Sequence, residues 1–190
     1  VNAKMGLICA TPTAGSAGVV SGVLLAVIDR LKLTHQQQLD FLFTAGAFGL
    51  VIANNASISG AEGGCQAEVG SASAMASAAL VAASGGTPDQ SAQAVAITIK
   101  NMMGLICDPV AGLVEVPCVK RNALGSSQAF ISADMALAGI RSVIPPDEVI
   151  HAMYQVGRQM PQIFKETAEG GLAVTPTAQR LSKEILEKQK

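Results

Sequence analysis

Three of the four cysteines stand near glycine or proline, in segments where a thiol can be accessible to a ligand or a metal. Their settings are Gly-Gly-Cys65, Cys107-Asp-Pro and Pro-Cys118. Such neighbours are typical of loops and helix ends rather than of a packed core. A thiolate at a helix N-terminus is stabilised by free backbone amides and by the positive end of the helix dipole, and Cys65 and Cys118 fit that position. The small neighbours also leave room for a bulky inorganic centre.

The spacing of these cysteines leaves other roles open. Free cysteine is among the most buried residue types, so each thiol could be structural. Structural zinc sites usually bring pairs of cysteines two to four residues apart. Here the successive separations are 42 and 11 residues, which contain no such pair. Spacing alone therefore slightly favours a structural role over a metal site.

The surroundings of the cysteines shift this balance. Residues 55–66 and 108–122 are long, polar and glycine-rich passages in an otherwise apolar chain. Loops rich in hydrogen-bond donors, held between well-capped helices, are where binding residues normally lie. These two passages therefore favour a binding site around the three thiols.

Four motifs make the chain resemble the alpha chain, or catalytic domain, of the iron–sulfur-dependent L-serine dehydratases, over essentially all 190 residues. The motifs are Thr-Pro-Thr-Ala-Gly at 11–15, the passage 55–66, Cys-Asp-Pro-Val-Ala-Gly at 107–112 and Pro-Cys-Val-Lys-Arg-Asn at 117–122. The resemblance implies that Cys65, Cys107 and Cys118 ligate a [4Fe–4S] cluster. It leaves one iron without a protein thiolate and places Cys9 outside the ligand set.

The implied reaction is the dehydration of L-serine to pyruvate and ammonia. This reaction removes an unacidic Cα proton and expels hydroxide, so it needs a base and a Lewis acid. The iron without a protein thiolate would act as the Lewis acid on the substrate hydroxyl. Two alternatives stay open. A related family removes sulfide from L-cysteine with a similar set of three cysteines, and a non-catalytic helical interaction module could simply bury its thiols.

Arg121 and Asn122 are the first candidates for binding the substrate. They follow Cys118 by three and four residues, which places them on its face of a helix that begins near Pro117. We expect Arg121 to bind the substrate carboxylate, and an ordinary ion pair is the alternative. For Asn122 a site role and a structural role are balanced.

The other candidates for substrate binding lie in two turns. Thr13 and Gly15 precede a helix and could present a hydroxyl and free amides to an anion, or could serve as a plain N-cap. Asn55, Ser57 and Ser59 could orient the substrate ammonium and hydroxyl. Local turn hydrogen bonds would equally explain these three residues.

The catalytic base is less well defined by the sequence. Glu68 lies one turn after Cys65 and Glu62 lies in the adjacent loop, so either could reach the centre or be a structural carboxylate. His35 and His151 fall in amphipathic helix patterns away from the motifs. The resemblance implies a beta chain, or a fused N-terminal domain, with a Ser/His-rich motif that we expect to supply the proton acceptor. It also implies a homo- or hetero-oligomer.

Helix signals dominate the elements that must position these residues. Thr34 with Gln37, and Thr87 with Gln90, form capping boxes that predict helices over 35–54 and 88–103, the second ended by Gly104. Residues 65–84 are nearly all small on every face, which predicts a buried central helix. Further helices are expected from 147 and from 176. Because no run alternates with period two, we expect one all-α domain of roughly seven or eight helices over 1–190, lacking the upstream segment of a full alpha chain.

Composition narrows the class of protein. The chain is 49% apolar but only 3% aromatic, so its interior must be built from small and aliphatic residues. A net charge of −1 offers no footprint for nucleic acid or an anionic membrane. Apolar stretches such as 41–53 fall short of the ~18 residues of a membrane span and are expected to form buried helices. Four cysteines without a secretory signal indicate reduced thiols in the cytoplasm.

Overall fold

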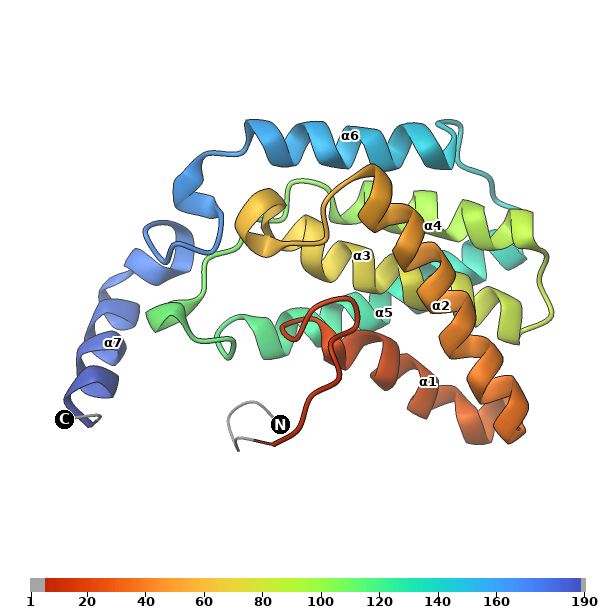
Figure 1. Ribbon diagram of the computed structural model, residues 1–190, viewed down its shortest axis with the longest axis horizontal. Helices are drawn as coiled ribbons and strands as arrows, with labels where there is room; N and C mark the ends of the chain where they lie inside the picture. Colours follow the sequence, from red (N-terminus) through yellow and green to blue (C-terminus); the bar gives the residue numbers. More distant parts are fainter. Residues whose placement is uncertain (1–5, 189–190) are drawn as a thin grey trace.

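The computed structural model describes residues 6–188 and shows seven α-helices over that range (Figure 1). These are α1 (Ala17–Leu31), α2 (His35–Asn55), α3 (Gly60–Ala83), α4 (Pro88–Met102), α5 (Cys118–Leu137), α6 (Pro146–Gln159) and α7 (Pro176–Lys188). Three short 3₁₀ helices join them, namely η2 (Val110–Gly112), η3 (Gln162–Phe164) and η4 (Gly171–Val174). Within the described residues no strand forms, apart from one isolated bridge between Cys107 and Lys165. The expected all-α architecture is confirmed.

Helix α3 lies in the middle of the bundle and packs against α1, α2, α4, α5 and α6. Every residue from 63 to 81 is buried, as expected for a helix of small side chains without a polar face. Backbones approach closely here. A Cβ placed on Gly125 of α5 would lie 2.5 Å from the Ser73 Oγ and 2.9 Å from the Val69 Cγ1 of α3. Small residues thus let α3 accept neighbours on all sides.

Local capping decides where α2 and α4 begin. The Thr34 Oγ1 accepts a hydrogen bond from the Gln37 amide (3.3 Å), and the Gln37 Oε1 accepts one from the Thr34 amide (2.9 Å). Thr87 and Gln90 make the same pair of bonds at the start of α4. Helix α4 ends beside Gly104, whose φ of 86° lies in the left-handed region. The predicted capping boxes are therefore confirmed.

The expectation that the apolar stretch 41–53 forms a buried helix is wrong. Phe41 and Ile52 face the core of the bundle, but Phe43 is 74% exposed and Leu50 is 63% exposed. The reason is geometric, because α2 lies on the outside of the bundle and only the face toward α3 and its neighbours is covered. Across residues 6–188, none of the helices combines the length and apolar character needed to cross a membrane.

The C-terminal part forms a second, smaller packing unit beside the central bundle. Helix α7 lies at one end of the molecule and packs against η2 and η4. Ala173 and Ala178 are buried in this contact. The chain from η3 to η4 thereby runs back alongside the loop that carries Cys107, which it holds in place.

Candidate metal centre

The first turn of α3 is broken at Gly64, which has φ 73° and ψ −175°. A side chain at this position would be strained by the backbone, and its Cβ would lie 2.7 Å from the Met160 Sδ. Cys65 therefore begins a new helical segment inside the molecule. The Gln66 amide donates to the Leu105 carbonyl (2.9 Å) rather than within its own helix. The expectation that Cys65 lies at a helix N-terminus is confirmed in this form.

The loop that carries Cys107 is fixed from two sides. The Gln66 side chain accepts a hydrogen bond from the Gly104 amide through its Oε1 (2.8 Å). On the other side, the Cys107 amide donates to the Phe164 carbonyl (2.8 Å), and the Glu166 amide donates to the Cys107 carbonyl (3.1 Å). Cys107 is thus held between the start of α3 and the segment after η3.

Burial separates the four cysteines into two groups. Cys65, Cys107 and Cys118 are 1%, 2% and 7% exposed, whereas Cys9 is exposed. Cys118 is the first residue of α5, as the sequence predicts. The Sγ atoms of Cys65 and Cys107 and a carboxylate oxygen of Glu68 all lie within 4.8 Å of one another. Three separate segments thus supply the buried thiols.

The three buried thiols differ in acidity. A hydrogen bond from the Cys107 thiol lowers the pKa of Cys65, assisted by the charge on Arg121 and opposed by burial. The same hydrogen bond, together with burial, raises the pKa of Cys107. Burial, followed by the charge on Cys65, raises the pKa of Cys118 to about 11. Of the three buried thiols, Cys65 is therefore the one whose surroundings favour the thiolate.

Arg121 links the segments that carry Cys65 and Cys107. Its Nη1 donates to the Asp108 Oδ1 (2.7 Å), to the Ile106 carbonyl (2.9 Å) and to the Cys65 Sγ (3.6 Å). Burial alone would lower the pKa of the guanidinium, but the charges on Cys65 and Asp108 raise it. Asp108 is buried, and its Oδ2 also accepts from the Leu172 amide (2.7 Å). The ordinary ion pair that the sequence analysis gave as the alternative for Arg121 is present. The same guanidinium also contacts the Cys65 thiol.

Glu68 joins the centre to the turn before α1. The Thr13 Oγ1 donates to the Glu68 Oε1 (2.5 Å) and also lies 2.9 Å from the Ser16 Oγ. Gly15 allows this approach, because a Cβ there would lie 2.6 Å from the Glu68 Oε1. Burial raises the pKa of Glu68, against the lowering effect of Thr13 and with a further increase from the charge of Glu166.

Gly60, the first residue of α3, marks the point where several of these groups meet. A Cβ there would lie 3.2 Å from the Glu68 Oε2, 3.2 Å from the Glu166 Oε2 and 3.3 Å from the Cys107 Sγ. Two carboxylates and a thiol therefore converge on a backbone position without a side chain. The glycine keeps space open between them.

Asn122 connects α5 to the start of α1. Its Nδ2 donates to the Gly15 carbonyl (2.8 Å) and to the Cys118 carbonyl (2.9 Å), and its Oδ1 accepts from the Gly18 amide (3.1 Å). The side-chain amide is thus bonded to backbone on both its oxygen and its nitrogen. In this arrangement Asn122 holds the turn at Gly15 next to the first turn of α5, which carries Cys118.

Comparison with known proteins decides the family. The family model described as "Serine dehydratase alpha chain" matches residues 1–173. The chain belongs to the serine dehydratase alpha chain family. A Bacillus subtilis (strain 168) protein named "Probable L-serine dehydratase, alpha chain" is 70% identical over 185 residues, which are 97% of this chain and 62% of the relative.

Two further relatives of the serine dehydratase alpha chain family cover the chain equally well. A Latilactobacillus sakei protein with the same name is 60% identical over 97% of this chain and 88% of the relative. The "L-serine dehydratase, alpha chain" of Peptoniphilus asaccharolyticus is 50% identical over 98% of this chain and 64% of the relative. The chain thus spans less than two thirds of the length of the Bacillus and Peptoniphilus proteins.

Not every site residue expected from the family motifs lies among the thiols. The Asn55 Nδ2 donates to the Val51 carbonyl (2.8 Å), and the Ser57 Oγ donates to the Glu62 Oε2 (2.5 Å) and accepts from the Ser59 amide (3.1 Å). These are the local turn bonds that the sequence left open. The two histidines, His35 and His151, are exposed.

Three residues of the centre were not among the sequence candidates. Asp108 stands inside the Cys-Asp-Pro motif of the serine dehydratase family, so its place beside a cysteine was a usable signal. Gln66 follows Cys65 directly and could have been noted in the same way. Glu166 carries no such signal, because only the return of the chain after η3 brings it to Gly60.

Proposed function

We propose that this chain dehydrates L-serine to pyruvate and ammonia at the centre formed by the three buried cysteines. The observation that carries the proposal is the convergence of the Cys65 and Cys107 thiols with the Glu68 carboxylate beside Arg121. The reaction requires a proton acceptor and a Lewis acid, and thiols are groups that can hold a metal as that Lewis acid. The names of the relatives, L-serine dehydratase alpha chains, support the same reaction.

The residues present fit a [4Fe–4S] cluster held by Cys65, Cys107 and Cys118. All three thiols are buried, and soft thiolate ligands favour iron–sulfur clusters. Gly60 leaves space beside Cys107, and the Arg121 guanidinium offsets thiolate charge in a buried setting. When bound, the cluster would supply a Lewis acid that stabilises the departing hydroxide of the substrate.

The chain's own residues divide into two groups in this proposal. Arg121 and Asn122 position the centre, since Arg121 contacts the Cys65 Sγ and Asn122 holds the Cys118 carbonyl. Glu68 faces the space beside Gly60, where it would hold or move a proton at its Oε2, and Thr13 holds the other oxygen of this carboxylate. Gly15 lets the Thr13 turn approach this carboxylate.

Residues 55–59 are proposed to shape the substrate-binding part of the centre indirectly, through the turn that leads to Gly60. Ser59 directly precedes Gly60, while Asn55 and Ser57 shape the turn that leads to it. The proton acceptor for the Cα proton is proposed to come from a beta chain, because the relatives are named as alpha chains and both histidines of this chain are exposed. The active enzyme would then be an oligomer that contains both chains, in the cytoplasm.

Anaerobic reconstitution with ferrous iron and sulfide tests the cluster. We expect a broad visible absorbance band and about four iron ions per chain. Cys65→Ser, Cys107→Ser and Cys118→Ser should each abolish or greatly weaken the band. Cys9→Ser is the matched control and should leave it intact, because Cys9 is exposed and apart from the centre. Colourless protein, even with the partner chain present, would favour a non-catalytic helical module.

Turnover by the reconstituted protein with its partner chain tests the reaction. L-Serine should yield pyruvate faster than L-threonine or L-cysteine is converted, and a preference for L-cysteine would identify a desulfidase instead. Glu68→Gln should keep the visible band but lower kcat on the order of 100-fold or more, because the proton-carrying group is lost. Glu187→Gln, on the exposed face of α7, should leave kcat unchanged. If the Glu68→Gln enzyme keeps its kcat, Glu68 has only a structural role.

A further inference from the structure

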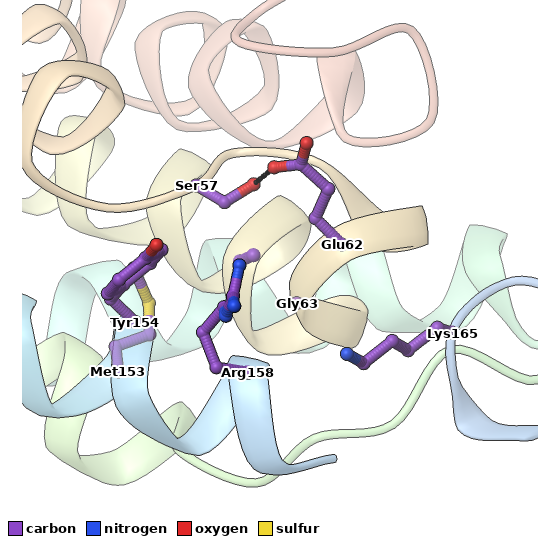
Figure 2. A pocket seen from close by; sticks show the side chains of 9 residues that line it. Ser57, Glu62, Gly63, Met153, Tyr154, Arg158 and Lys165 are labelled. Carbon is purple, nitrogen blue, oxygen red and sulfur yellow. Dashed lines mark hydrogen bonds between the residues drawn. The ribbon is translucent and has the colours of Figure 1, made fainter. Parts of the chain in front are cut away.

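A second cavity lies on another side of α3 from the cysteines. It has a volume of about 340 Å³, is open to solvent on one side, and is lined by the loop and first turn of α3, by α6 and by the segment after η3 (Figure 2). None of the three buried cysteines lines it. Ala67 does, and on a helix Ala67 points about 160° away from Cys65 and about 100° away from Glu68. The cavity is therefore separate from the centre described above.

Positively charged side chains outnumber negatively charged ones in this cavity. Figure 2 shows Arg158 extending from α6 and Lys165 extending from the segment after η3, both toward the first turn of α3. Within the described residues neither cation forms an ion pair. The acidic group on the opposite wall is Glu62, which accepts a hydrogen bond from Ser57. Two cations and one carboxylate give the cavity an excess of one positive charge.

We propose that this cavity binds a small molecule with one carboxylate group, either an amino acid or a 2-oxo acid. The planar fork of Arg158 matches the geometry of a carboxylate, and Lys165 adds a second positive charge. The excess of one positive charge balances a single carboxylate, whereas the second negative charge of hydrogen phosphate would lie unbalanced in the same cavity as Glu62. A cavity of this volume also accommodates only a small ligand.

The remaining polar groups distinguish the two possible sources of the carboxylate. Glu62 and Ser57 stand across the cavity from the cations and would pair with the ammonium of an amino acid. A 2-oxo acid lacks that ammonium and would leave Glu62 unmatched. The carboxylate is the shared feature, and the second contact decides between the two.

The position of Lys165 ties this cavity to the cysteine segment. Lys165 lies between Phe164 and Glu166, and both of these residues exchange backbone hydrogen bonds with Cys107. A ligand held by Lys165 therefore contacts the segment that holds Cys107. Under the proposed function, the substrate L-serine and the product pyruvate both belong to the ligand class of this cavity.

Calorimetric titration of the full metal-free chain tests the inference without any turnover. The probes are L-serine, pyruvate, the uncharged pyruvamide and inorganic phosphate. We expect one of the two carboxylates to bind and both pyruvamide and phosphate to bind at least about tenfold more weakly, since a charge-assisted hydrogen bond is lost or a repulsion gained. Tighter binding of L-serine than of pyruvate would assign the Glu62 side to an ammonium.

Variants locate the binding on the chain. Arg158→Gln and Lys165→Gln should each weaken binding about tenfold or more, while Arg180→Gln on α7 should leave it unchanged. Unaltered melting temperatures would establish that the variants remain folded. Binding that survives in the double variant, or no carboxylate binding to the folded chain, would overturn the inference. Because iron and turnover play no part here, either result is independent of the proposed dehydration.

Discussion

Helices α2 and α3 are neighbours in the chain, and both are apolar, yet they occupy opposite environments. Helix α3 is built of alanine, serine and glycine and is buried along residues 63–81. Helix α2 carries larger side chains but exposes Leu42, Phe43 and Leu50. The difference teaches that the size of the side chains, more than their polarity, decides which helix takes the centre. Small residues let several helices approach one axis at once, whereas large ones fill a single interface.

This difference also explains where the thiols lie. The cysteines need a setting that five packed helices hold rigid, and the first turn of α3 offers it together with a backbone break at Gly64. Helix α2 ends just before this turn and contributes no side chain to the centre beyond its following loop. The buried helix thus carries two groups of the centre, Cys65 and Glu68, whereas the half-exposed helix packs against it from outside.

The largest expected effect contrasts two phenylalanines of α2. Phe41 is 1% exposed, so Phe41→Ala should lower the free energy of unfolding by about 3–5 kcal/mol through lost burial and a cavity. Phe43 is 74% exposed, and Phe43→Ala should change it by no more than about 0.5 kcal/mol. Urea unfolding followed by circular dichroism measures both. Equal losses would mean that the outer face of α2 is packed in the protein as purified.

A pair of glycines gives the next contrast. Gly125→Ala should lower the free energy of unfolding by about 1–3 kcal/mol, because its Cβ would meet Ser73 and Val69 of α3. Gly46→Ala in α2 meets nothing within 4 Å and should raise it by about 0.5–1 kcal/mol through helix propensity. Thermal unfolding distinguishes the opposite signs. A neutral Gly125→Ala would contradict the close approach of α3 and α5.

The smallest effect concerns two serines of α3. Within the described residues the buried Ser71 Oγ has no hydrogen-bond partner, so Ser71→Ala should raise the free energy of unfolding by about 1 kcal/mol. Ser73→Ala is the control, since the Ser73 Oγ donates to the Val69 carbonyl (2.7 Å). It should not stabilise the protein. If Ser71→Ala lowers stability in the same urea titration, that hydroxyl has a partner in solution.

Local signals predicted much of the fold. The starts of α2 and α4 followed from Thr34 and Thr87 because a capping box involves only residues within one turn. The buried α3 followed from its composition. The exposed face of α2 could not be predicted, because an apolar pattern does not state how many neighbours surround it. That depends on where the helix lies in the bundle.

The candidate centre was predictable to a similar degree. Cys65, Cys107 and Cys118 were selected by their motifs, and the structure buries all three. Their role as cluster ligands stays a prediction, as do the roles of the expected substrate residues. The partners of these residues were not predictable, because Glu68 meets Thr13 only through the folding of α1 against α3.

By itself the sequence determined the helices, their caps and the residues able to bind a metal, because these depend on side-chain type and on interactions within a few residues. Only the tertiary structure decided that Cys65 starts a helical segment after Gly64, that Arg121 joins it to Asp108, and that Glu166 reaches Gly60. Cys65, Cys107 and Cys118 belong to separate segments of the chain. The convergence of Cys65 and Cys107 with Glu68 is decided by packing around α3, which no local pattern specifies.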